Sequence, residues 1–171
     1  MILKYKIYNL FFGSKLKSEC HQILIDKNTY YKNLSSENKK IFLIRTLYFY
    51  AFTYFTSERR YPIKKSMEFL ISSAFVQITF GLNVDLLRHF KTIEIVPESY
   101  SYRDTNKTYH GDVNPKSKKI SLVWPVVERG FLISDDALNL SIHEFGHVLI
   151  IENSLRNYLN RIFPQKKWSH F

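Results

Sequence analysis

The sequence predicts an α+β fold in which helices come first, a small β-sheet follows, and a helix with two histidines one turn apart comes last. Three observations lead to this prediction: helical spacing of apolar residues before residue 81, two short alternating segments after residue 90, and the motif His143-Glu144-Phe145-Gly146-His147. A chain of 171 residues fits one domain with a substantial core, and its composition of 45% apolar and 16% aromatic residues indicates a folded globular protein.

Two long segments are predicted to be core helices. Residues 37–55 give a broad apolar surface at helical spacing, and Ser35 or Ser36 is available as the N-cap. The apolar residues of segment 62–80 follow helical spacing closely. Pro62 can begin this helix and Gly81 can end it. Both helices are expected to be scaffold.

Two alternating segments are predicted to be strands. Residues 92–96 and 119–124 alternate apolar and polar side chains, and each is followed by a proline. The polar connection between them, residues 98–118, could be a long hairpin or a loop over a cleft. Residues 120–124 are the expected edge for an extended peptide. Trp124 could line that cleft, although a packed core position is favoured.

The last predicted helix begins near a cap at Ser134 or Asp135 and runs to about residue 157. Its apolar residues fall on one side of the helical wheel. They are Leu138, Ile142, Phe145 and Leu149. Because the two histidines of the motif lie on a different side, we expect a helix with one side buried in the core and another side that carries the metal ligands.

The motif on this helix predicts a zinc site. One turn separates His143 from His147, so both imidazoles can reach one metal ion. Glu144 sits about 100° further round the helix, where it can flank a metal-bound water without coordinating the metal. Metal-assisted hydrolysis, with Zn²⁺ as cofactor and Glu144 as general base, is therefore the leading hypothesis.

Several short stretches of the chain occur in an order that is more specific than the motif alone. They include residues 69–74, 81–82, 93–95, 111–114, 120–124, 128–130 and 139–147. In this order they resemble the Mlc titration factor A family of cytosolic zinc-dependent peptidases, also called glucose-regulated metallopeptidases. The resemblance begins at about Thr29 and implies a zincin-like fold, aminopeptidase-type activity and, in enteric bacteria, binding of a transcriptional repressor of sugar uptake. It also implies that His143 and His147 are zinc ligands and that Glu144 is the catalytic base.

The resemblance implies a third zinc ligand, a Glu on a later helix well beyond the motif. The only acidic residue after the motif is Glu152, which lies on another side of the helix and cannot reach the same metal. His170 lies near the end of the chain, and His110 and Asp112 lie in the connection before the second strand. For each of these three residues a role other than metal ligand is favoured.

The expected domain organisation is an N-terminal arm, residues 1–28, followed by a zincin-like metallopeptidase domain, residues 29–171, that lacks the part with the third zinc ligand. The leading function is hydrolysis of a peptide or protein substrate. The alternative is a catalytically incomplete binding protein that sequesters a partner such as a transcriptional regulator.

Charge and cysteine content argue against several other classes of protein. The formal charge is +10, but the basic residues are spread along the chain in separate pairs without a nucleic-acid-binding signature, so no nucleic-acid partner is expected. The single Cys20 cannot form an internal disulfide, and beside His21 it is too isolated for a redox or catalytic site, which favours a cytoplasmic protein. The lysines at 4, 6, 15 and 17 could rest on an anionic membrane, but packing of the aromatic arm on the domain is favoured and membrane contact is not expected.

Overall fold

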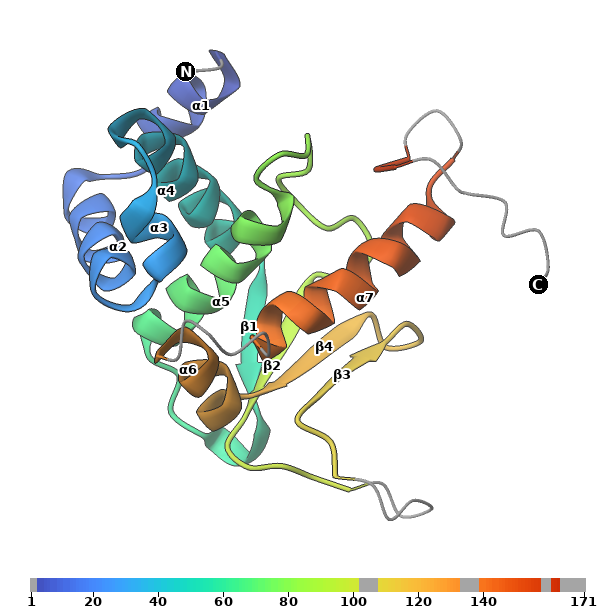
Figure 1. Cartoon of the computed structure of the whole chain (residues 1–171). Helices are drawn as coiled ribbons and strands as arrows, with labels where there is room; N and C mark the ends of the chain where they lie inside the picture. The colour runs from blue at the N-terminus through green and yellow to red at the C-terminus, as the bar shows by residue number, and fades with distance from the viewer. Residues whose placement is uncertain (1–2, 102–107, 133–138, 158–160, 164–171) are drawn as a thin grey trace.

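The computed structural model describes residues 3–101, 108–132, 139–157 and 161–163, and it confirms the predicted α+β class (Figure 1). The helices are α1 (Leu3–Leu10), α2 (Ser14–Lys27), α3 (Thr29–Asn33), α4 (Ser36–Ala51), the 3-10 helix η1 (Glu58–Arg60), α5 (Lys65–Thr79), α6 (Trp124–Leu132) and α7 (Leu140–Leu155). The strands are β1 (Tyr54–Ser57), β2 (Thr92–Val96), β3 (Gly111–Asn114) and β4 (Lys119–Val123).

The two predicted core helices are α4 and α5. The Ser35 side chain caps α4 by accepting a hydrogen bond from the backbone N–H of Asn38 at 3.3 Å. The prediction of helix as far as residue 55 is wrong, because α4 ends at Ala51 and residues 54–57 form β1. Pairing with β2, far along the chain, decides this, and the Tyr54 N–H begins it by donating to the Lys91 carbonyl.

The sheet has the order β1-β2-β4-β3, in which β1, β2 and β4 run parallel and β3 runs antiparallel to β4. Strands β2 and β4 have the predicted positions, and the connection before β4 contains β3 and closes as a hairpin. The expectation that residues 120–124 form an edge is wrong, because β4 is paired on both sides. The edge next to α7 is β3 (Figure 1).

One face of the sheet is apolar and packs into the main core. The side chains of Ile93, Ile95, Ile120 and Leu122 are at most 1% exposed and belong to the same buried cluster as helix residues of α5 and α7. Because side chains alternate along a strand, the neighbouring Glu94, Ser121 and Asp112 share the opposite face. Helix α7, which carries the His-Glu-X-X-His motif, therefore lies on the apolar side of the sheet.

Helix α6 was not predicted. Trp124, read as the end of a strand, is the first residue of α6 and is 6% exposed in the core, the position favoured for it. Pro125 then occupies the first turn of a helix, where the missing N–H costs no hydrogen bond. A proline that looks like a strand terminator is here a helix initiator.

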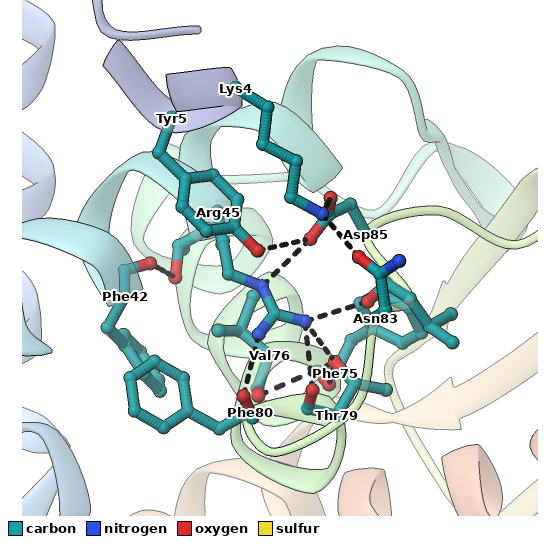
Figure 2. A network of polar contacts seen from close by, with 12 residues as sticks. Lys4, Tyr5, Phe42, Arg45, Phe75, Val76, Thr79, Phe80, Asn83 and Asp85 are labelled. Carbon is teal, nitrogen blue, oxygen red and sulfur yellow. Dashed lines mark hydrogen bonds and ion pairs between the residues drawn. The ribbon is translucent and has the colours of Figure 1, made fainter. Parts of the chain in front are cut away.

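Residues expected to form an arm are folded onto the domain. They form α1 and α2, and Cys20 and Leu24 of α2 are fully buried. Beneath α1, the Arg45 guanidinium, 2% exposed, donates to the carbonyls of Thr79, Phe80 and Val84 and pairs with Asp85 at 3.0 Å (Figure 2). Among the described residues, no helix combines the length and the apolar character that crossing a membrane requires.

Candidate metal centre

Helix α7 carries the motif and starts later than predicted. The Asn139 side chain caps it by accepting a hydrogen bond from the Ile142 N–H at 3.2 Å. The caps expected at Ser134 and Asp135, and the apolar Leu138, lie outside the described residues. The helix ends at Leu155 and not near residue 157.

The two faces of α7 differ as the sequence predicts. His143 and His147 are exposed, whereas Phe145 is 1% and Leu149 is 4% exposed in the core. The buried side also includes polar residues that the apolar stripe does not predict. These are Ser141, Glu144, Glu152 and Asn153.

The two histidines converge on one point. Their Nε2 atoms are 3.0 Å apart, and their rings are edge to face with centroids 4.5 Å apart. For an ion at the usual Zn–N distance of about 2.0–2.1 Å from both nitrogens, the N–Zn–N angle would be about 95°, which is about 15° smaller than the tetrahedral angle. Small rotations of exposed rings close that difference, so this pair of donors fits zinc.

Glu144 lies between the histidines along the chain, but its side chain is turned toward β3 and is 7% exposed. Gly111 of β3 provides the space for it. A Cβ atom on Gly111 would lie 2.8 Å from Glu144 Oε1 and 2.9 Å from its Cγ, closer than real Cβ contacts allow. The Glu144 side chain can therefore pack this closely against the edge strand only because residue 111 has no side chain.

Burial raises the pKa of the Glu144 carboxyl above its ordinary value. The neighbouring His143 and His147 oppose this shift when charged, and the negative charge of Asp112 adds to it. The result is a carboxyl group that holds a proton more readily than an exposed glutamate does. That is the property required of a general base that must keep and then return a proton.

A hollow of about 400 Å³ lies beside His143. Residues of α3, α5, α6 and α7 line it, including Tyr30, Gln77 and Phe131. None of its described lining residues is an Asp, Glu, Lys or Arg. The hollow is not predicted by the sequence, because its walls come from four helices whose packing is not visible in the sequence.

Glu152 is directed away from the histidines, in agreement with the expectation that it cannot share their metal. It is fully buried, and its carboxylate accepts hydrogen bonds from the backbone N–H groups of His89 at 2.5 Å and Phe90 at 3.3 Å. His89 Nδ1 lies 3.2 Å from the same carboxylate. Burial by itself would raise the pKa of Glu152, but these hydrogen bonds hold it below its ordinary value. Glu152 thus ties α7 to the segment before β2.

The other candidate third ligands do not join the site among the described residues. His110 Nδ1 lies 2.7 Å from Ser99 Oγ, and Asp112 lies on the face of β3 opposite to Gly111. His170 lies outside the described residues. Across the described part of the chain, no group of three or more His, Cys, Asp or Glu residues could hold a metal ion.

An α+β domain with the pattern His-Glu-X-X-His on a helix, its glutamate packed beside an edge strand, has the features of a metal-dependent peptidase. The chain belongs to the family described as glucose-regulated metallo-peptidase M90, whose sequence model matches residues 6–170. The family resemblance stated from the sequence is therefore confirmed. Comparison with curated proteins and with solved structures gave no match.

Proposed function

We propose that this chain is a zinc-dependent peptidase of the aminopeptidase type, with His143 and His147 as zinc ligands and Glu144 as the general base. The observation that carries the proposal is the geometry of α7: two exposed Nε2 atoms 3.0 Å apart, next to a glutamate buried against β3. Membership of a metallopeptidase family supports it. A cytoplasmic location is part of the proposal, because the one cysteine, Cys20, is a buried free thiol.

His143, His147 and Glu144 each have a defined role in this mechanism. Zinc bound by the two imidazoles would supply the Lewis acidity that polarises a peptide carbonyl and acidifies a water molecule. Glu144 accepts the proton of that water and later delivers it to the leaving amine. Its raised pKa favours the first transfer, because a carboxylate disfavoured by burial accepts a proton more readily than an exposed one does.

Strand β3 and the hollow beside His143 support a polypeptide as the substrate. One side of β3 is the end of the sheet among the described strands, so its backbone groups there can pair with an extended peptide. Such a peptide would run past Glu144, which packs on the same strand at Gly111. The hollow of about 400 Å³ is large enough for a substrate side chain.

A second candidate is a binding protein that keeps the site but not the activity, and that sequesters a partner such as a transcriptional regulator. The observation in its favour is that the described residues contain no cluster of three potential metal ligands. Zinc held by two histidines alone would be bound more weakly than in a site with three protein ligands.

Metal content and turnover separate the two candidates. The purified chain is dialysed against a weak chelator and its zinc is measured by elemental analysis, beside His147→Ala and the control His21→Ala, which removes a histidine of α2. The peptidase proposal predicts near-stoichiometric zinc in the chain and in the control, and loss of zinc in His147→Ala.

Turnover of a peptide library by the zinc-loaded chain is then compared with that of Glu144→Gln. The peptidase proposal predicts cleavage that Glu144→Gln abolishes while zinc content is unchanged. Turnover retained in Glu144→Gln would remove Glu144 from the role of base. Zinc without any turnover, in the chain and in the variant alike, would favour the binding protein.

A further inference from the structure

Helix α1 is held on the domain by one face only. Tyr5 is 3% exposed, and Tyr8 stacks on Tyr48 of α4 with ring centroids 3.9 Å apart. Lys4 Nζ lies 2.7 Å from Asp85 Oδ2, and the Tyr5 hydroxyl donates to the same carboxylate at 3.2 Å (Figure 2). These contacts fix the orientation of α1, and so they also fix which face points outward.

The outward face of α1 is apolar. Leu3 is 70%, Ile7 49%, Leu10 83% and Phe11 72% exposed. The spacing of these residues places them on one side of the helix and of the turn that follows it. From the sequence we expect the apolar residues here to pack on the domain, and Tyr5, Tyr8 and Phe12 do so. This stripe does not.

Basic residues border the stripe. On the helical wheel Lys6 lies on one side of it and Lys4 on the other, and Lys15 follows at the start of α2. Lys6 and Lys15 are exposed. The first acidic residue of the chain is Glu19, so the whole segment before it is positively charged.

We propose that α1 docks on an anionic lipid bilayer, with Leu3, Ile7, Leu10 and Phe11 at the level of the acyl chains and with Lys6 and Lys15 among the headgroups. An apolar stripe flanked by lysines is the pattern of helices that lie in a membrane interface. The charge favours a bilayer over a second copy of this chain, because a second copy would bring the same lysines against each other. This inference does not rest on the proposed peptidase activity.

The binding should be weak and reversible, because α1 offers eight helical residues and a single short stripe. Each exposed lysine near an anionic surface is expected to contribute about a fivefold change in partitioning. This part falls with ionic strength, because the Debye length is about 8 Å at physiological salt.

The test is co-sedimentation of the full chain with vesicles of phosphatidylcholine alone and of equimolar phosphatidylcholine and phosphatidylglycerol. The wild-type chain should bind the anionic vesicles, bind the neutral ones much less, and be released by salt. The double variant Leu10→Gln/Phe11→Gln should bind at least tenfold less, and Lys6→Gln about fivefold less. Ile150→Gln, which changes a residue of α7 that is 61% exposed, is the matched control and should bind as the wild type does.

Three results would overturn the proposal. The first is no binding of the wild-type chain to anionic vesicles. The second is equal binding by wild type and Leu10→Gln/Phe11→Gln, which would mean that charge alone attracts the chain. The third, from light scattering, is a wild-type dimer that Leu10→Gln/Phe11→Gln converts to a monomer, which would assign the stripe to self-association. Unchanged circular dichroism of the variants verifies that they are folded.

Discussion

Replacing Gly111 by alanine should disturb Glu144 and little else. The new Cβ would lie 2.8 Å from Glu144 Oε1, 2.9 Å from Cγ and 3.0 Å from Cδ, so the side chain must move by about 0.4–0.6 Å to restore an ordinary contact of 3.4 Å. No described glycine has a positive φ, so alanine meets no backbone strain at this position. The cost therefore comes from the side-chain contact.

The magnitude follows from overpacking against a buried side chain. Forcing an extra carbon into such a contact costs about 1–3 kcal/mol. For a chain of this length each kcal/mol lowers Tm by about 2–4 °C. In a peptidase, a carboxylate displaced by half an ångström should also lower kcat, by about tenfold, since a displacement of about 1 Å can cost about a hundredfold.

Denaturant unfolding of four proteins measures the effect: wild type, Gly111→Ala, Glu144→Ala and the double variant. Gly111→Ala should be destabilising alone and nearly neutral in the Glu144→Ala background, because the group it displaces is then absent. Gly81→Ala is the control, since nothing lies within 4 Å of a Cβ there. Equal stability of Gly111→Ala and wild type, or an equal cost in both backgrounds, would refute the reasoning.

Two further predictions concern buried charges. Hydrogen bonds hold the pKa of Glu152 below its ordinary value despite burial, so this carboxylate stabilises the fold above about pH 4.3 and the stabilisation is lost as pH falls through the lowered folded-state pKa. Glu152→Gln should therefore lower the unfolding midpoint at pH 7, and its curve should approach that of the wild type in acid; parallel curves at every pH would contradict this. Arg45→Met should cost about 3–5 kcal/mol in chemical denaturation, because the carbonyls of Thr79, Phe80 and Val84 lose their buried donor and Asp85 keeps only Lys4 and Tyr5 as partners, and a cost below 1 kcal/mol would argue against that role.

Local patterns predicted some elements well. Residues 92–96 alternate and are followed by a proline, and they form β2 with those limits. The exposed position of His143 and His147 also followed from helical geometry alone. In both cases the signal is a side-chain pattern within one element.

Other features depend on partners that are distant in the sequence. Residues 54–57 continue an apolar run and read as helix, yet pairing with β2 makes them a strand. The structural role of Gly111 is not visible in the sequence, because it depends on how closely the Glu144 side chain approaches it. Glu152 reads as one more polar residue on a helix, and only the position of the segment before β2 explains why it is buried.

The ordered ends of α7 have a thermodynamic consequence for metal uptake. Asn139 caps the first turn of the helix, and the hydrogen bonds of Glu152 attach its last turns to the segment before β2. The two histidines between them are thus presented by a backbone that is already ordered, and only their side-chain rotations remain to be restricted. Zinc should then bind with little entropy loss from the backbone, and its stabilising effect should rise with free metal according to simple mass action on the folded chain.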